Sequence, residues 1–354
     1  MSYRITINPS GHIFNAEAGE TVLQAALRQG FPLPYGCRNG ACGTCKGKII
    51  QGKVDFGSHN DDTLTEIEKN KGLALLCCAL PLSELVIECR EIGAIKDIKI
   101  MKFPCRVQKM ELVAPDVMTI SLKLPTNERL QFLAGQYIDI LMKDGQRRSY
   151  SLANAPHDDE FLQLHVRNYL GGVFAEHTFS NMKEKDILRF EGPLGTFFLR
   201  EDSDKPIIFV ASGTGFAPVK SMLEHIFHVA ETRGNDRNII LYWGARTKAD
   251  LYLAELAGNW QQKYENFCFI PVLSEALKAD DWHGRAGLVH QAVLEDFDNL
   301  SGYQVYACGS PVMVGAARTD FIGLRTLPEV EVISVAFIPS PAGTKLYHYF
   351  LFFY

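Results

Sequence analysis

Residues 34–45 read PYGCRNGACGTC and place three cysteines at the spacing C-x4-C-x2-C. These are Cys37, Cys42 and Cys45, and Cys77 follows further along the chain. Four thiolates at this spacing are the ligand set of a [2Fe-2S] cluster. The residues between them are mostly small, which lets a loop wrap the cluster and point backbone N–H groups at its sulfur atoms. The stretch therefore predicts an iron–sulfur domain, with these four cysteines as metal ligands.

Two alternatives to this ligand set remain open on the residues alone. A zinc site uses cysteines too, although zinc favours paired C-x2-C units and only Cys42 and Cys45 form one. Cys78 becomes the fourth ligand if the register shifts by one residue. The loop and the segment Leu75-Leu76-Cys77 resemble plant-type ferredoxins. That resemblance favours Cys77, leaves Cys78 as a buried thiol, and implies a β-grasp ferredoxin domain over residues 1–92.

The length and composition limit the remaining possibilities. A chain of 354 residues exceeds what one hydrophobic core usually serves, so we expect two or three domains. A formal net charge of -5 provides no basic field, which disfavours a nucleic-acid partner. Nine cysteines, four of them at metal-ligand spacing, point to a reducing compartment and a cytoplasmic location. The apolar run at 346–354 is too short to cross a bilayer, so no integral membrane segment is expected.

The pattern of apolar and turn residues divides the chain further. Near the N-terminus we expect a hairpin over 3–8 and 13–14, a helix over 21–29, and a second helix that starts at Thr63 with a capping box to Glu66. Residues 93–102 read as a linker. Short β-like runs then predict an antiparallel barrel within 103–200, at 117–124, 137–141, 147–152 and 161–167. Alternating strands and helices predict a doubly wound parallel sheet over 204–338.

The predicted barrel contains a short polar motif, Arg148-Ser149-Tyr150-Ser151. It resembles the R-x-Y-S motif of the ferredoxin-reductase superfamily, in which this strand lies beside FAD. A guanidinium can fork onto a pyrophosphate, a phenol ring can stack on the isoalloxazine, and a hydroxyl can reach the flavin N5 edge. The alternative is that the four residues are plain barrel wall. The resemblance implies that Arg148 binds FAD and that Tyr150 and Ser151 take part in both binding and catalysis.

The next strand and turn extend this expected FAD site. His165 and Arg167 share one side of their strand. Gly171-Gly172 opens a turn that resembles the family's flavin-phosphate turn at a helix start. The family usually places a hydroxyl soon after that turn, and here the first candidate is Thr178. We therefore expect all five residues to contact the cofactor.

The third region carries two loops of the same superfamily. Residues 213–218 read GTGFAP between an apolar strand and a helix, where backbone N–H groups can cradle a phosphate. Residues 306–311 read YACGSP and resemble the loop that places a cysteine beside the nicotinamide. The resemblance implies nucleotide-binding roles at the positions Gly213, Thr214, Gly215, Pro218 and Gly309, and a binding and catalytic role for Cys308. The alternative for Cys308 is an ordinary buried thiol.

The choice between NADH and NADPH depends on the end of a later strand. In NADPH-using relatives the sequence at this place resembles Ser-Arg, whereas here Ser274 is followed by Glu275. A carboxylate repels a 2′-phosphate and accepts hydrogen bonds from a free ribose 2′-OH. NADH is therefore expected over NADPH. Glu275 can instead be a solvated loop residue, and Arg246 could still offer a phosphate its charge.

The order of the three regions resembles reductases that serve multicomponent oxygenases. Residues 241–246, LYWGAR, and 250–252, DLY, look most like the CDP-6-deoxy-glucoseen reductase branch, whose acceptor is a dehydrase of deoxysugar synthesis. The resemblance implies electron flow from NADH through FAD and the [2Fe-2S] cluster to a separate protein acceptor, an oxygenase or dehydrase component. Two other functions stay open: a redox sensor with a vestigial reductase, and a reductase that releases reduced flavin. No motif identifies the acceptor, the oligomeric state or the role of the atypical aromatic tail at 339–354.

Overall fold

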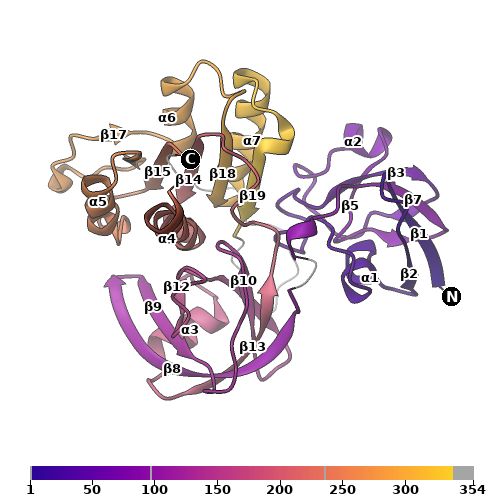
Figure 1. Cartoon of the computed structure of the whole chain (residues 1–354), viewed down its shortest axis with the longest axis horizontal. Coiled ribbons are helices and arrows are strands. Elements are labelled where there is room, and N and C mark those ends of the chain that lie inside the picture. The colour runs from indigo at the N-terminus through magenta and orange to yellow at the C-terminus, as the bar shows by residue number, and fades with distance from the viewer. Residues whose placement is uncertain (1, 96–97, 235–236, 338–354) are drawn as a thin grey trace.

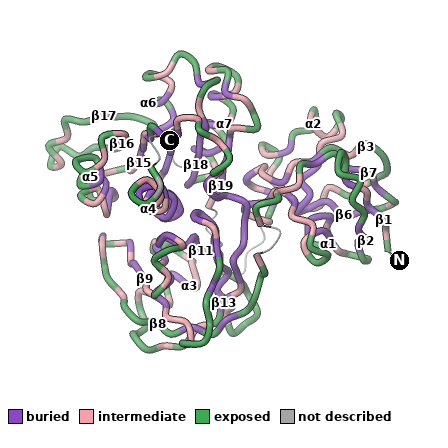
Figure 2. The backbone as a smooth tube through the Cα atoms, viewed as in Figure 1, coloured by how far each residue is buried: buried purple, intermediate pink, exposed green. Residues whose placement is uncertain are grey.

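The computed structural model describes residues 2–95, 98–234 and 237–337, which form three bodies in the order of the chain (Figure 1). The aromatic tail at 339–354 lies outside the described residues, as do two positions of the expected linker. Figure 2 shows buried residues in the interior of each body and exposed residues along its outer loops. Among the described residues, no helix is long and apolar enough to cross a membrane.

The N-terminal body is a five-stranded sheet in the order β2-β1-β7-β3-β5, in which the β1–β7 pair is parallel and the other pairs are antiparallel. Helix α1 buries one apolar face in the same core as β1. This arrangement confirms the predicted β-grasp. The elements are β1 (Ser2–Asn8), β2 (Ile13–Glu17), α1 (Val22–Arg28), β3 (Lys46–Gln51), β4 (Val54–Asp55), α2 (Glu66–Asn70), β5 (Leu73–Leu75), β6 (Leu80–Pro81), β7 (Leu85–Glu88) and the 3-10 turn η1 (Gly93–Ile95).

The start of α2 differs from the prediction. The capping box is formed by Thr65 and Glu68, two residues after the expected pair of Thr63 and Glu66. Both pairs satisfy the local rule of a threonine followed three residues later by glutamate. Thr63 is used elsewhere, because its hydroxyl donates to the carbonyl oxygen of Ala41 in the cysteine loop at 3.2 Å. A tertiary contact therefore decides where this helix begins.

The middle body is the expected antiparallel barrel, a six-stranded sheet in the order β11-β10-β13-β8-β9-β12. A bridge between Leu152 and Leu164 brings its two edge strands together and closes it. Closure removes the exposed edges of the sheet and encloses an apolar core. The elements are β8 (Met101–Ala114), β9 (Val117–Lys123), β10 (Tyr137–Leu141), β11 (Arg147–Ser151), β12 (Leu162–Arg167), α3 (Val173–Ser180) and β13 (Ile187–Leu194).

The third body is a six-stranded, wholly parallel sheet in the order β17-β16-β15-β14-β18-β19. Two separate apolar clusters cover its faces, as a doubly wound sheet requires. The elements are β14 (Ile207–Ser212), η2 (Gly213–Gly215), α4 (Phe216–Arg233), β15 (Ile239–Ala245), η3 (Lys248–Asp250), α5 (Ala254–Lys263), β16 (Phe267–Leu273), η4 (Lys278–Asp280), β17 (Arg285–Ala286), α6 (Val289–Asp296), β18 (Gln304–Gly309), α7 (Pro311–Arg325), η5 (Glu329–Glu331) and β19 (Val332–Ala336).

The strand order of this sheet reverses between β14 and β18. Ligands of such folds bind outside the carboxyl ends of the strands at this reversal. The loop after β14 begins at Gly213 and β18 ends at Gly309, so the two glycine segments expected from the sequence meet at the reversal.

Candidate functional site

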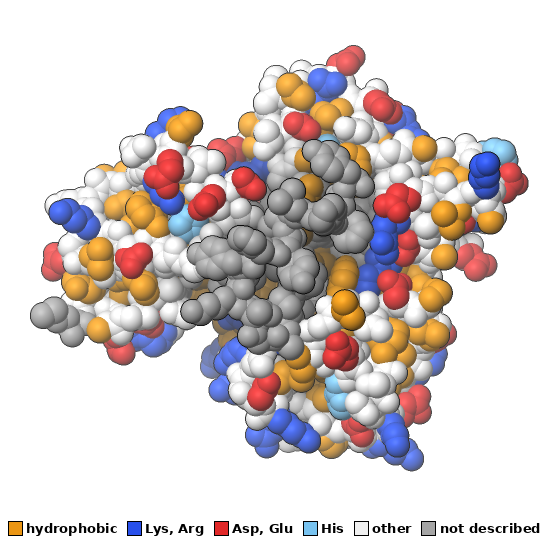
Figure 3. Space-filling view, turned by 180° about the vertical axis from the view of Figure 1, so that it is seen from behind, with side chains coloured by type: hydrophobic (Ala, Val, Ile, Leu, Met, Phe, Trp, Pro, Cys, Tyr) orange, Lys and Arg blue, Asp and Glu red, His pale blue; other side chains and the backbone are white. Residues whose placement is uncertain are grey.

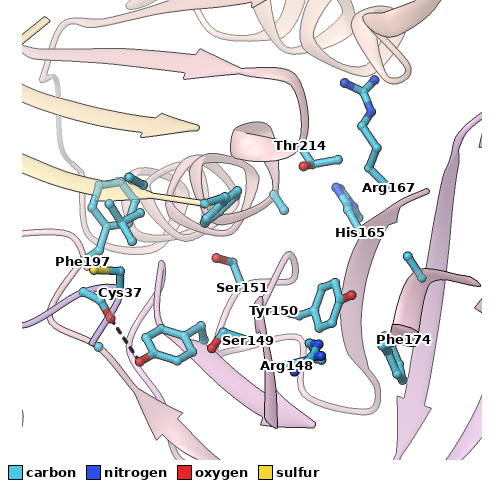
Figure 4. Close-up of a pocket in the computed structure, with 18 of the residues that line it drawn as sticks. Cys37, Arg148, Ser149, Tyr150, Ser151, His165, Arg167, Phe174, Phe197 and Thr214 are labelled. Atoms are coloured by element: carbon cyan, nitrogen blue, oxygen red, sulfur yellow. Dashed lines mark hydrogen bonds between the residues drawn. The ribbon is translucent and has the colours of Figure 1, made fainter. Parts of the chain in front are cut away.

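A cavity of about 290 Å³ lies where the three bodies meet. The barrel lines it with β11 and β12, the cysteine loop with Gly36 and Cys37, and the parallel sheet with Thr214 and the end of β19. Figure 4 shows Cys37, Tyr150 and Thr214 around the same space, although they belong to three different bodies. The fold thus brings the three regions that carry the sequence motifs to one site.

The β11 motif forms one wall of the cavity. The ring centroid of Tyr150 lies 5.1 Å from that of Phe174, and burial raises the pKa of Tyr150, which keeps the phenol neutral. The guanidinium of Arg148 donates to the backbone oxygen of Arg147 at 2.8 Å, while its Nε is buried without a partner in the structure. Ser151 also lines the cavity. A buried donor left free beside a stackable ring suits a flavin cofactor with a phosphate group.

The residues of β12 contribute a second wall and also contact the parallel-sheet body. His165 is 4% exposed, and a hydrogen bond of 2.9 Å joins its Nδ1 to the hydroxyl of Tyr252. Burial lowers the pKa of His165 to about 3, so the ring is neutral, and its buried Nε2 has no partner in the structure. Arg167 lines the cavity as well, but its guanidinium is paired with Asp116 at 3.1 Å and Asp250 at 3.0 Å.

The glycine turn before α3 reaches the cavity only in part. Gly172 lines it and caps α3, whereas the Gly171 N–H donates to the carboxylate of Glu176 at 2.9 Å. Thr178 is buried and is not among the lining residues, because its hydroxyl donates to Phe174 inside the helix at 2.8 Å. The structure therefore does not bring Thr178 to the expected phosphate position.

The first nucleotide loop is the short turn η2. It places Thr214 in the cavity wall, and Pro218 lies in the first turn of α4, where a missing N–H is tolerated. Gly213 has a left-handed φ of 53°, and its carbonyl accepts a hydrogen bond from the Trp243 indole at 3.0 Å. A Cβ at Gly215 would lie 2.7 Å from the carbonyl carbon of Cys308. The loop after β14 is thus packed tightly on the end of β18.

Cys308 itself does not line the cavity. Its side chain is 0% exposed within the core between the sheet and α4, and burial raises the pKa of its thiol. Strand β18 continues through Gly309, which has a φ of 142° that glycine adopts readily. The backbone of Cys308, rather than its sulfur, faces the nucleotide loop.

The residues expected to discriminate between NADH and NADPH lie close to one another but outside this cavity. Arg246, Ser274 and Glu275 are exposed at the carboxyl ends of β15 and β16. The Glu275 N–H donates to the backbone oxygen of Arg246 at 2.8 Å. The two oppositely charged side chains therefore start from adjacent backbone positions at the strand edge where a nucleotide is expected.

The cysteines of the N-terminal body approach one another in two pairs. Cys37 shares a hydrogen bond with Cys42, which lowers the pKa of Cys42 to about 6. Cys45 shares one with Cys77, and this bond and another from Cys78 lower the pKa of Cys77 to about 4. A [2Fe-2S] cluster requires two thiolate ligands on each of its two irons. The approach of the four cysteines in two pairs fits such a cluster.

Comparison with known proteins defines the class first. Residues 5–82 match the 2Fe-2S iron-sulfur cluster binding domain, residues 104–199 the oxidoreductase FAD-binding domain, and residues 209–319 the oxidoreductase NAD-binding domain. The chain is therefore an NAD(H)-dependent oxidoreductase of the class that carries FAD and a [2Fe-2S] cluster. The predicted fold class and cofactor types are confirmed.

Whole-chain relatives then define the family. The CDP-6-deoxy-L-threo-D-glycero-4-hexulose-3-dehydrase reductase of Yersinia pseudotuberculosis is 42% identical over 96% of this chain and 100% of its own length. The phenol 2-monooxygenase reductase component DmpP of a Pseudomonas species is 37% identical over 97% and 96%. The crystal structure of the Amycolatopsis cytochrome P450 reductase GcoB superposes with a TM-score of 0.74 at 32% identity, covering 94% of this chain and 98% of that one. The chain belongs to this family of three-domain iron–sulfur flavoprotein reductase components, as its motifs predicted.

Proposed function

We propose that this protein supplies single electrons to a separate dehydrase that acts on a CDP-linked 6-deoxyhexulose. The cavity shared by Tyr150 and Cys37 carries the electron-transfer part of this proposal, because it places the expected flavin wall against the cluster loop. The choice of acceptor is supported by the 42% identity to the Yersinia pseudotuberculosis reductase over its whole length. An oxygenase component is the second candidate acceptor, supported by the 37% identity to the phenol 2-monooxygenase reductase component.

For the cluster, we assign Cys37, Cys42, Cys45 and Cys77 as ligands. The assignment is supported by their approach in two pairs and by the C-x4-C-x2-C spacing of the first three. Cys78 lies with its Sγ 3.5 Å from that of Cys77 and is assigned as a neighbour of the cluster. When bound, the cluster accepts and releases one electron at a time.

For FAD, we assign Arg148, Tyr150, Ser151, His165 and Gly172. The unpartnered buried nitrogens of Arg148 and His165 and the ring of Tyr150 are the observations that fit a flavin with its pyrophosphate. Because His165 is neutral, its Nε2 can exchange a hydrogen bond with the cofactor without adding charge to the site.

The remaining assignments around FAD differ in strength. Arg167 is retained as a wall of the cavity that also ties β12 to the parallel-sheet body through Asp250. The Gly171 backbone is retained at the glycine turn, where its N–H can turn from Glu176 to a phosphate. Thr178 is left out, since its hydroxyl is used within α3.

For the nicotinamide nucleotide, we assign the backbone of Gly213, Thr214 and Gly215 with Pro218 at the start of α4. Cys308 and Gly309 support this loop from the end of β18, so Cys308 enters the proposal through its backbone.

The strand-edge residues Ser274 and Glu275 favour NADH, because the carboxylate can accept from a ribose 2′-OH and repels a 2′-phosphate. The backbone oxygen of Arg246 accepts a hydrogen bond from the Glu275 N–H, and Arg246 is assigned to the same end of the sheet.

The decisive experiment is an anaerobic titration of the holoprotein with NADH, followed by steady-state assays. Bleaching of the flavin absorbance together with the EPR signal of a reduced [2Fe-2S] cluster is expected. NADH oxidation should then be stimulated by the purified CDP-6-deoxyhexulose dehydrase more than by a phenol hydroxylase. A protein that does not oxidise NADH with artificial acceptors would be a redox sensor. Unchanged NADH consumption after loss of the cluster, with flavin released into solution, would indicate a reductase that supplies free reduced flavin.

We also place the protein in the cytoplasm. The placement is supported by the cysteine content, because four of the nine cysteines are assigned above to a cluster rather than to a disulfide framework. Immunodetection in cytoplasmic and periplasmic fractions of the source cells tests this placement.

A further inference from the structure

A buried carboxylate lies between the cluster loop and the flavin wall. Asp139 belongs to β10, and its side chain is 1% exposed. One of its oxygens, Oδ2, is paired with the guanidinium of Arg38, which follows the cluster ligand Cys37 directly. The other, Oδ1, accepts a hydrogen bond of 2.6 Å from the hydroxyl of Ser149, which precedes Tyr150. A single carboxylate therefore joins the two halves of the expected electron path.

Arg38 adopts an unusual conformation in making this contact. Its φ is 58°, in the left-handed region that non-glycine residues seldom occupy. The side chain is 29% exposed, and its guanidinium carbon lies 5.9 Å from the centre of the Tyr137 ring. The backbone at Arg38 is thus held in a strained form that turns the side chain toward the barrel.

The contacts around this pair align the two bodies further. The Tyr137 hydroxyl donates to the backbone oxygen of Gly36 at 3.1 Å. The N–H of Tyr35 donates to the hydroxyl of Thr196 at 2.9 Å, and the N–H of Thr196 donates to the carbonyl of Tyr35 at 2.9 Å. These contacts hold the residues just before Cys37, while the Arg38 pair holds the residue just after it.

Within the barrel, Asp139 adds nothing to the apolar core and has only a distant cation. Ile138 and Ile140, the neighbours of Asp139, supply the apolar core on β10. Arg147, the barrel's own cation near Asp139, has its Nη1 3.7 Å from Oδ2 and is paired more closely with Glu191. Burying a carboxylate is unfavourable unless it is paired and hydrogen-bonded. Its strongest compensation comes from Arg38, across the boundary between the two bodies.

We propose that Asp139 is a positioning residue that sets the distance and orientation between the cluster loop and the flavin strand, through Arg38 on one oxygen and Ser149 on the other. The proposal rests on the function proposed above, because it concerns the step from the flavin site to the cluster. It predicts that the pair governs how fast the cluster is reduced while leaving NADH oxidation at the flavin site intact.

The test uses the holoproteins Asp139→Asn, Arg38→Gln, their double variant and the conservative Arg38→Lys. Ferricyanide, a small oxidant, reports NADH oxidation at the flavin, and cytochrome c, a one-electron protein acceptor, reports delivery through the cluster. In Asp139→Asn and Arg38→Gln we expect FAD content, the cluster EPR signal and ferricyanide reduction to stay at wild-type levels. Cytochrome c reduction and the stopped-flow rate of cluster reduction should fall on the order of tenfold or more, as for other small misplacements of reacting groups. Arg38→Lys should recover part of the loss.

The double variant shows whether the two residues act together. If they do, its cytochrome c rate should match that of either single variant rather than the product of the two losses. The control is Arg129→Gln. It removes a surface ion pair between Arg129 and Asp159, which both belong to the middle body, and should change neither assay. An unchanged ratio of cytochrome c to ferricyanide activity, or fully multiplicative losses, would overturn the proposal.

Small-angle scattering gives a readout that does not depend on electron transfer. If the N-terminal body takes a wider range of positions relative to the other two bodies in Arg38→Gln than in wild type, the positioning role is supported. Identical scattering curves count against it. If the wild type oxidised no NADH at all, the proposed function would fail, while the scattering comparison would still test the contact. The two failures can therefore be told apart.

Discussion

Replacing Gly215 with alanine is the most direct test of how the nucleotide loop is built. Gly215 has helical backbone angles, φ −56° and ψ −15°, so alanine is conformationally acceptable there. The added Cβ, however, would lie 2.7 Å from the carbonyl carbon of Cys308 and 3.0 Å from Cα of Gly309, which are backbone atoms that cannot rotate away. The loop and the end of β18 must separate by roughly 1 Å to reach a normal contact.

A displacement of that size in a substrate-positioning loop reduces activity by about 10²-fold, or about 2.7 kcal/mol in the activation barrier. We expect this loss in kcat/KM for NADH, measured with ferricyanide, while FAD content and the cluster EPR signal stay unchanged. Gly258→Ala is the matched control, because Gly258 lies inside α5 of the same body and its added Cβ meets nothing within 4 Å. Wild-type kcat/KM in Gly215→Ala would refute the inferred packing between the two loops.

Three further outcomes follow from the site. Cys77→Ser should abolish the EPR signal of the reduced cluster and Cys78→Ser should preserve it, and the reverse result would make Cys78 the ligand. Glu275→Arg should shift the ratio of kcat/KM for NADH over NADPH toward NADPH by roughly fivefold or more, the worth of one close charge pair in water; an unchanged ratio would remove Glu275 from the nucleotide site. Because the folded pKa of His165, about 3, lies below its ordinary value of 6.5, the unfolded chain binds the extra proton first and stability falls as pH decreases from 6.5 toward 3. Urea unfolding followed by FAD fluorescence should show wild type losing about 2 kcal/mol more than His165→Gln between pH 7 and pH 5, whereas parallel losses would mean that His165 is not buried neutral.

The cluster loop and the nucleotide loop could be predicted from the sequence because their chemistry is local. The spacing of Cys37, Cys42 and Cys45 reflects the reach of one short loop around one cluster. The GTGFAP stretch likewise needs only the strand before it and the helix after it, and the structure has β14, η2 and α4 in that order. In both cases the ligand requirement and the backbone requirement fall within about a dozen residues.

Arg167 shows where such local reasoning ends. It was a candidate for cofactor binding because it shares one side of its strand with His165, and it does line the cavity. Its second partner, Asp250, is 83 residues away and belongs to another body, so no periodicity or motif could reveal the pairing. The position of Thr178 could not be predicted for a related reason, since its hydroxyl bonds to the carbonyl of Phe174 within its own helix.

Cys308 shows that a motif can identify a backbone position without revealing where the side chain at that position lies. Gly309, the glycine of this motif, ends β18 with a φ of 142°. Yet Cys308 is still inside the strand, where successive side chains alternate between the two faces of the sheet. The cysteine side chain enters the apolar cluster that contains Phe216 and Trp243, whose rings stack with centroids 3.9 Å apart. A small buried residue at this position lets the carbonyl, not the thiol, meet Gly215, which is why the geometry of the nucleotide loop depends on packing behind the sheet.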